Sequence, residues 1–175
     1  CHTALAEAEI EYSDETSPSI YVKFKLDTVP GVFEAAGVDA DAYVLIWTTT
    51  PWTLPANTAV SLAPDADYVM VEVDGSYLLI ALDLVEQVAE TAGWETYRIV
   101  SGADGEPVAL KGRELYGLTY TAPVRQDLKG TVIYGDHVTL DTGTGAVHTA
   151  PGHGQDDYLV ALEFDVPLLM PVDDN

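Results

Sequence analysis

Two polar runs, each placed directly after an apolar segment, contain most of the side chains in this sequence that could do chemistry. The first run is residues 48–57, TTTPWTLPAN, and the second is residues 143–158, GTGAVHTAPGHGQDDY. Both combine hydroxyl groups with stiff prolines, and the second adds histidines and carboxylates. These groups are typical of a small pocket that binds a polar ligand.

The carboxylates Asp156 and Asp157 fall in the first turn of an expected helix, after two glycines that allow a sharp turn. Either carboxylate could simply cap free helix amides and interact favourably with the helix macrodipole. Adjacent helical side chains point about 100° apart. We therefore expect one carboxylate to cap and the other to face a pocket, where it would attract an ammonium group.

His148 ends a short expected strand and has three candidate roles: proton shuttle, metal ligand or part of a pocket wall. Together with His153 and Asp157 it suggests a zinc site. No local spacing matches the known zinc patterns, so no metal is predicted. His153 lies between two glycines and is expected to be a loop residue.

Thr48, Thr49 and Thr50 place hydroxyl groups on both faces of an expected strand end. Threonine is also a good strand former, so a purely structural role is an alternative. The following Pro-Trp pair ends the strand and leaves the last hydroxyl at a rim, where it could bind a carbonyl, a ribose or a water. Asn57 could do the same, or could cap a turn.

Asp141 belongs to a competing signature, because Val138–Gly143 resembles the apolar-Asp-Thr-Gly sequence of aspartic proteases. A chain of this size would supply one carboxylate and would need a homodimer to supply the second. The match covers three residues, and the sequence that follows it does not continue the signature.

Patterning predicts the elements that position these groups. Period-two alternation or short apolar runs predict strands at residues 4–12, 19–26, 43–47, 67–73, 76–81, 94–100, 131–134, 138–140 and 145–148. The Asp74-Gly75 pair predicts a type I′ hairpin between the fourth and fifth of these strands.

Helices are expected from Asp83, as the capping residue, to about Thr91 with Gly93 as the stop, and over residues 156–164. Residues 29–31 are expected to form a turn and residues 101–107 a loop, and residues 111–124 have no clear assignment. The predicted fold class is mainly β, a closed β-barrel-like core with a few peripheral helices.

The 175 residues are enough for one core, and a single domain spanning 1–175 is expected. Residues 1–16 and 167–175 are expected to be junction segments, with both ends cut from a longer polypeptide. No run approaches the length that a membrane span needs, and no signal peptide is expected. The single cysteine excludes an internal disulfide.

The net charge is −22, from 29 acidic and seven basic residues. The acidic residues are spread along the chain, which favours adaptation to high salt, where screening quenches self-repulsion. A non-catalytic acidic module that binds a basic partner is the alternative. So few basic side chains argue against tight independent binding to a nucleic-acid backbone.

The two polar runs resemble the editing domains of isoleucyl-tRNA synthetases, which are inserted into the catalytic Rossmann fold of these class I enzymes. The related valyl and leucyl enzymes carry Thr-Thr-Arg-Pro in the first run and Pro-Ala-His in the second, whereas both runs here match the isoleucyl type. Residues 4–9 and 135–138 fit the same family, so the resemblance covers essentially the whole chain. The synthetic ATP-binding signatures, His-Ile-Gly-His and Lys-Met-Ser-Lys-Ser, do not occur in it.

The resemblance implies an aminoacyl-tRNA deacylase that hydrolyses Val-tRNA(Ile), with valyl-adenylate as a second substrate. One missing methylene gives a synthetic pocket little discrimination, so a second site must destroy the smaller product; this enzyme is the standard case. The implied partners are the tRNA(Ile) 3′ end carrying valine and the rest of the synthetase chain. The resemblance further implies a cytoplasmic monomer that needs no cofactor, since ATP and Mg would serve the synthetic domain.

The same resemblance implies the roles of individual residues. The carboxylate of Asp157 would anchor the substrate ammonium group, and His148 would shape the pocket so that valine enters and isoleucine does not. The three threonines would contact the adenosine end or position water. The substrate-binding residues would be Thr53, Asn57, Trp52, Gly145 and Ala146.

Overall fold

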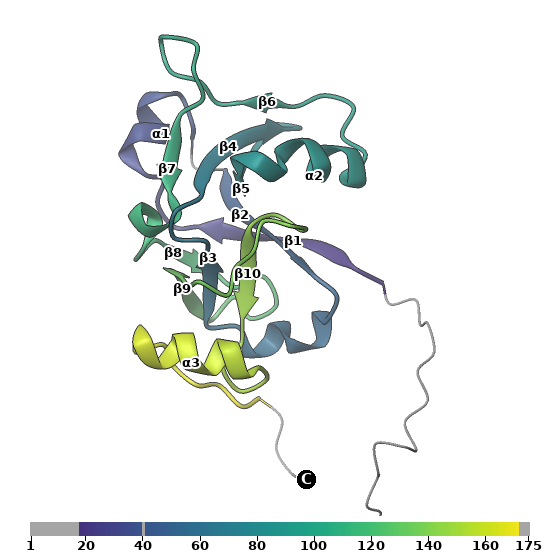
Figure 1. Cartoon of the computed structure of the whole chain (residues 1–175), viewed down its shortest axis with the longest axis vertical. Helices are drawn as coiled ribbons and strands as arrows, with labels where there is room; N and C mark the ends of the chain where they lie inside the picture. The colour runs from purple at the N-terminus through teal and green to yellow at the C-terminus, as the bar shows by residue number, and fades with distance from the viewer. Residues whose placement is uncertain (1–17, 40, 172–175) are drawn as a thin grey trace, which may run out of the picture.

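The computed structural model describes residues 18–39 and 41–171, within which ten strands form one mixed sheet with helices around it (Figure 1). The strands are β1 (Ile20–Leu26), β2 (Ala42–Thr48), β3 (Ala59–Leu62), β4 (Asp67–Val73), β5 (Ser76–Ala81), β6 (Arg98–Ile99), β7 (Ala109–Lys111), β8 (Thr119–Thr121), β9 (Lys129–Tyr134) and β10 (Ala146–Thr149). The helices are α1 (Gly31–Ala35), α2 (Val85–Ala92) and α3 (Gln155–Glu163), with 3₁₀ turns η2 (Pro51–Ala56), η3 (Leu82–Leu84) and η4 (Gly112–Leu115). The strand predicted at 4–12 lies outside the described residues.

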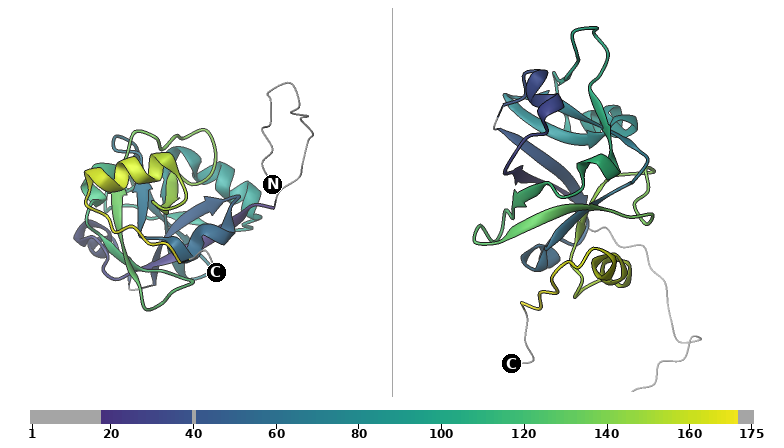
Figure 2. Two further views of the ribbon diagram at one scale, coloured as in Figure 1. Left: turned by 90° about the horizontal axis from the view of Figure 1, so that it is seen from below. Right: turned by 90° about the vertical axis from the view of Figure 1, so that its left-hand side faces the viewer.

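The sheet runs in the order β10-β3-β9-β8-β1-β2-β5-β4-β6, and β7 also pairs with β4. The pairs β2–β5 and β3–β9 are parallel and the others antiparallel. The sheet curls enough for β10 to pack against β2, five positions away in the order (Figure 2). The predicted β-rich architecture with peripheral helices is therefore confirmed. Closure of the barrel is not observed, since within the described residues the hydrogen-bonded order has open ends.

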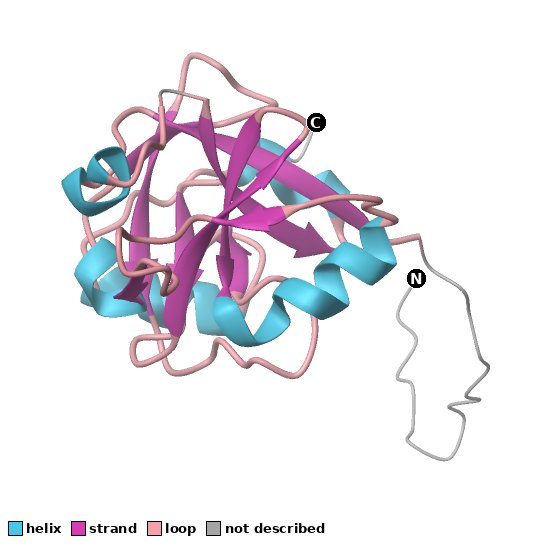
Figure 3. Ribbon diagram, turned by 90° about the horizontal axis from the view of Figure 1, so that it is seen from above, coloured by secondary structure: helices cyan, strands magenta, loops and turns pink. Residues whose placement is uncertain are grey.

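The strand β2 is the centre of this arrangement. Its central residues Val44, Leu45 and Ile46 are at most 3% exposed, as expected for a strand covered on both faces. A smaller cluster of Ala59, Ile133 and Val160 attaches α3 to β3 and β9. Figure 3 shows the helices outside the sheet. The ends of β2 and β10 and the start of α3 thus come together next to well-packed, buried parts of the sheet.

The hairpin between β4 and β5 is confirmed, with φ of 49° at Asp74 and 78° at Gly75. Gly93 ends α2 as predicted, in the left-handed conformation with φ of 68°. The prediction that Asp83 caps α2 is wrong. Asp83 lies inside the turn η3, and α2 begins after Leu84 without a side-chain cap.

Other boundaries differ because tertiary packing overrides the local pattern. Residues 138–140 form a loop, in which the amide of Val138 donates to the carbonyl of Gly135 while the valine side chain is buried. The segment 94–100 contains only the two-residue strand β6, and the turn at 29–31 leads directly into α1. The unassigned segment 111–124 contains the end of β7, η4 and β8. Within the described residues, none of the helices is both long enough and apolar enough to cross a membrane.

Candidate functional site

A cavity of about 420 Å³ lies where β2, η2, β10 and α3 converge, and we call it cavity A. Six of the ten side chains predicted for the site line it. Its lining residues are Trp47, Thr48, Thr50, Trp52, Thr53, Val147, His148, His153 and Asp157.

His148 forms a wall of cavity A and is 8% exposed. Its Nε2 lies 2.9 Å from the hydroxyl of Thr53, and its Nδ1 lies 2.8 Å from the amide nitrogen of Asn57. Because an amide nitrogen only donates, Nδ1 must accept, and the ring proton is on Nε2. The Thr53 hydroxyl accepts this proton and donates its own to the carbonyl of Thr50, at 2.9 Å.

These contacts leave His148 without a free lone pair for proton abstraction. Burial lowers its pKa to about 4, against an opposing effect of Asp157 and a smaller lowering effect of His153. The imidazole is therefore neutral at physiological pH and shapes the cavity. Of the three candidate roles of His148, forming part of a pocket wall is the one that fits this geometry.

Asp157 occupies the first turn of α3 and is partly buried. Its Oδ2 accepts a hydrogen bond from the amide of Ala150, at 2.8 Å. Among the described residues no hydrogen bond to Oδ1 occurs, so this oxygen is available to a ligand in cavity A. The neighbouring Asp156 is exposed and does not line the cavity.

The threonine run makes a local turn at the rim of cavity A. The Thr48 hydroxyl accepts the amide proton of Thr50 at 3.0 Å and lies 3.2 Å from the Thr50 hydroxyl. The turn leads into η2, where Pro51 at the first position supplies a preset φ. Trp52 follows and is 70% exposed, which makes it a bare indole face beside the cavity.

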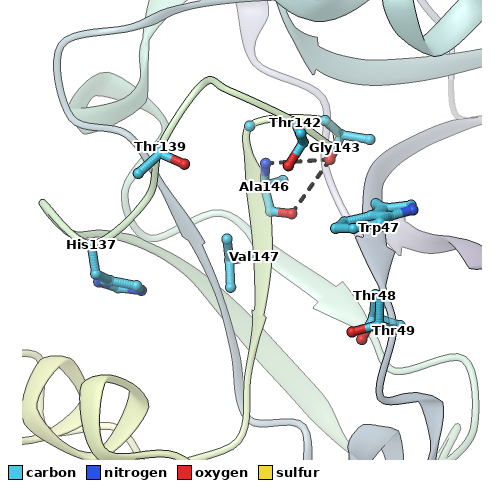
Figure 4. A pocket seen from close by; sticks show the side chains of 11 residues that line it. Trp47, Thr48, Thr49, His137, Thr139, Thr142, Gly143, Ala146 and Val147 are labelled. Atoms are coloured by element: carbon cyan, nitrogen blue, oxygen red, sulfur yellow. Dashed lines mark hydrogen bonds between the residues drawn. The ribbon is translucent and has the colours of Figure 1, made fainter. Parts of the chain in front are cut away.

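A second cavity of about 240 Å³, cavity B, adjoins cavity A and shares Trp47, Thr48 and Val147 with it (Figure 4). Its lining contains three of the four remaining predicted positions, Thr49, Gly145 and Ala146, but not Asn57. Its full lining is Trp47, Thr48, Thr49, His137, Thr139, Thr142, Gly143, Thr144, Gly145, Ala146 and Val147.

Gly145 has a structural role in cavity B. Its φ is +75°, and a Cβ at this position would lie 2.5 Å from the Cβ of Ala81. Its carbonyl accepts a hydrogen bond from the buried hydroxyl of Tyr68. Gly145 therefore fixes the path of the chain into β10.

Asn57 differs from the expectation for a substrate-binding residue. It is 2% exposed and lies behind His148, where its amide also donates to the carbonyl of Ala59 and its oxygen accepts from Tyr120. The sequence did not identify three further residues of the site, Trp47, Val147 and Tyr120. Strand alternation at the end of β2 is the signal that could have identified Trp47.

The competing sites receive no support. Asp141 is exposed in the loop before β10 and lines neither cavity. In residues 18–39 and 41–171, no group of three or more His, Cys, Asp and Glu side chains is placed to hold a metal ion.

Several solved structures have this fold. The chain matches GlLeuRS-CP1 with a TM-score of 0.67 and 19% identity, over 83% of this chain and 60% of that one. It matches the editing domain of the P. knowlesi cytosolic leucyl-tRNA synthetase with a TM-score of 0.64 and 13% identity, over 84% of this chain and 62% of that one. The fold is that of the editing domains of class I aminoacyl-tRNA synthetases.

The sequence narrows this class further. The chain is 51% identical to the isoleucine–tRNA ligase of Desulfovibrio desulfuricans over 99% of its length, and 48% identical to that of Moorella thermoacetica over 100%. It belongs, as a segment, to the isoleucine–tRNA ligase family. The chain spans 18% of the length of these relatives. No family model matches it.

Proposed function

We propose that this chain is the editing module of an isoleucine–tRNA ligase and hydrolyses the ester bond of valine mischarged to tRNA(Ile). Valyl-adenylate is a second substrate of the same site. The observation that carries the proposal is the convergence of the Asp157 carboxylate, neutral His148 and the hydroxyl groups of Thr48 and Thr50 on cavity A.

Asp157 binds the α-ammonium group of the substrate through its available Oδ1. A charge-assisted hydrogen bond of this kind is roughly twice as strong as a neutral one. With the amine held there, the amino-acid side chain packs against His148 and Val147, where a further methylene on isoleucine collides. Collision with a rigid wall excludes the larger side chain. A second site that hydrolyses only the smaller product requires that exclusion.

Hydrolysis at this site depends on positioning. A water attacks the ester carbonyl carbon, the bond to the ribose oxygen breaks, and one proton of that water passes to the ribose oxygen, which leaves as a hydroxyl group. Both nitrogens of His148 are engaged, and Asp157 is paired with the amine, so neither takes the proton. The threonine hydroxyl groups orient the water and polarise the already activated ester.

The nucleoside end of the substrate binds without help from basic side chains. Neither cavity A nor cavity B is lined by a lysine or an arginine. Stacking on the exposed indole of Trp52 supplies the affinity that phosphate contacts supply elsewhere. The rest of the synthetase presents the tRNA to this acidic surface.

The test compares hydrolysis of Val-tRNA(Ile) and Ile-tRNA(Ile) by the 175-residue chain. We expect faster release of valine, and loss of that release in the variant Asp157→Ala. Equal hydrolysis of the two esters would contradict the proposal. A non-hydrolysable valyl-adenosine analogue and its isoleucyl counterpart provide the matching binding experiment, with tighter binding of the valyl compound expected.

A further inference from the structure

Tyr120 lies outside both cavities but is connected to cavity A by hydrogen bonds. It belongs to β8 and is fully buried, and its hydroxyl donates to Oδ1 of Asn57 at 2.7 Å. The amide nitrogen of Asn57 in turn donates to Nδ1 of His148 at 2.8 Å. Two buried side chains thus link the middle of the sheet to the wall of the site.

Packing fixes the position of the Tyr120 ring. Tyr120 pairs across the strands with Gly130 in β9, and a Cβ at Gly130 would lie 2.2 Å from the tyrosine Cζ. The ring therefore lies over the glycine backbone, where only glycine leaves room. The Phe24 ring packs against Tyr120 in a T-shaped arrangement, with ring centroids 5.1 Å apart. The hydroxyl has no other position available without moving both neighbours.

The amide of Asn57 has one satisfied orientation between its neighbours. Its nitrogen donates to the carbonyl of Ala59, an acceptor, and its oxygen accepts from Tyr120. Burial raises the pKa of Tyr120 above that of free tyrosine, so the hydroxyl keeps its proton. If the amide were reversed, its oxygen would face the Ala59 carbonyl.

We propose that Tyr120 is a positioning residue of the editing site, which orients Asn57 and thereby holds His148 in the tautomer with its proton on Nε2. With the opposite tautomer, Thr53 would have to donate to Nε2 and would release the carbonyl of Thr50. The start of η2 and the threonine run would then lose a contact that fixes them. Tyr120 thus acts on the rim of cavity A through three intervening side chains.

Among the described residues, neither of the titratable groups that face His148 is hydrogen-bonded to its ring nitrogens. Asp157 comes from α3 and His153 from the loop before it, and they act on the pKa in opposite directions. Asn57 and Thr53 are the neutral partners on the remaining sides. Selection between the tautomers therefore rests on the orientation of Asn57.

The test is a ¹⁵N NMR measurement of the imidazole nitrogens of His148 in the ¹⁵N-histidine-labelled chain at neutral pH. In the unsubstituted chain we expect a protonated Nε2 and an unprotonated Nδ1. The variant Tyr120→Phe keeps the ring and removes the donor, which leaves Asn57 Oδ1 buried without a partner. Losing one hydrogen bond worth about 0.5–1.5 kcal/mol shifts the tautomer ratio about 2- to 10-fold toward Nδ1–H, so the two signals move toward each other.

Tyr68→Phe is the matched control, because it also removes a fully buried tyrosine hydroxyl, one bonded to backbone groups of Ala63 and Gly145. It should leave the His148 signals in place. Unchanged signals in Tyr120→Phe, or equal movement in both variants, would overturn the inference.

A second variant provides an alternative test if Tyr120→Phe does not fold. Asn57→Asp puts an acceptor against Nδ1, so a proton should appear on Nδ1; an unprotonated Nδ1 in that variant would also overturn the inference. The catalytic meaning rests on the proposed function, but the NMR signals do not. A tautomer shift in a chain that hydrolyses no ester would refute the function and leave the inference intact.

Discussion

Asp157 and Ala150 are joined by a hydrogen bond from the alanine amide to Oδ2 of the carboxylate, with 2.8 Å between the two atoms. This contact ties the first turn of α3 to the residue that follows β10. It satisfies one carboxylate oxygen and leaves the other available to cavity A. One side chain therefore fixes the wall of the site and remains able to bind a cation.

The two roles of Asp157 can be separated by the variant Asp157→Asn. The amide oxygen still accepts from Ala150, so the wall is kept, but the negative charge is lost. Hydrogen bonds to charged groups are worth about 1.5–3 kcal/mol, so the valyl-adenosine analogue should bind about 10- to 150-fold more weakly. Calorimetric titration measures the change, and an analogue without the amino group should bind equally to both proteins.

Asp156→Asn is the matched control for that experiment. It removes the same formal charge from the adjacent residue of α3, which is exposed and does not line cavity A. Its affinity for the analogue should stay within about twofold of the unsubstituted chain, since exposed charges interact weakly with groups outside direct contact. An equal loss in both variants would mean that the overall field, not the contact, binds the amine.

Trp52 is predicted to bind the nucleobase by stacking. Base–aromatic stacking is worth about 1–3 kcal/mol per base, so Trp52→Ala should weaken binding of the valyl-adenosine analogue about 5- to 150-fold, whereas Trp52→Phe should retain most of the affinity. A simple valine ester without the nucleoside should be hydrolysed equally by all three proteins. Equal loss with both kinds of substrate would show that Trp52 supports the cavity and does not contact the base.

The parts of the fold that the sequence predicted well are those set by local rules. The apolar run of β2 and the Asp74-Gly75 turn each depend on residues a few positions apart. The contact of Tyr120 with Asn57 joins residues 63 positions apart, and no local pattern indicates it. The four-residue strand β3, buried throughout, was likewise missed because it has no alternation.

In the candidate site, too, local rules predicted some residues, whereas others depend on tertiary packing. The angle between successive helical residues predicted that one of Asp156 and Asp157 faces a pocket, and the family resemblance indicated Asp157. The structure places Asp157 in cavity A. The position of Asn57 behind His148 could not be predicted, because it depends on the packing of η2 against β10 and β8. Polar residue types alone did not distinguish a side chain that lines the cavity from one that orients its wall.

Gly145 is predicted to resist substitution more than other glycines with positive φ. Gly145→Ala combines left-handed strain of about 1–2 kcal/mol with overpacking of about 1–3 kcal/mol against Ala81. Gly117→Ala has a similar φ of +84° but meets open space, so it should cost only the strain. Urea unfolding measures both, and equal losses would remove the collision as a cause.

The acidic surface predicts that the chain is stabilised by salt. A net charge of −22 on 175 residues repels itself, and raising KCl from about 0.1 M to 1 M shortens the screening length from about 10 Å to about 3 Å. The melting temperature should rise by roughly 2–4 °C for each kcal/mol of repulsion removed. Sucrose at matched osmolality controls for excluded-solvent effects. A melting temperature that does not change with KCl would contradict adaptation to high salt.

His148 is predicted to make the stability of the fold depend on pH between about 6.5 and 4. The pKa of His148 falls from 6.5 to about 4 on folding, because the ring is buried. Between these values the unfolded chain binds a proton that the folded chain does not, so the free energy of unfolding decreases as the pH falls. At about 1.4 kcal/mol per unit, the loss approaches about 3 kcal/mol at pH 4 and is absent above pH 7.

The variant His148→Gln isolates this contribution. Its side chain can accept from Asn57 and donate to Thr53 but does not titrate, so the lost ring lowers stability by a constant amount at every pH. All other ionisable groups are common to the two proteins, so the difference between the curves isolates the imidazole of His148. The unfolding free energies of the two proteins, measured in urea at each pH, should therefore converge on acidification, by about 3 kcal/mol between pH 7 and 4. Parallel curves would mean that His148 takes up a proton as readily in the folded chain as in the unfolded one, and would contradict the prediction.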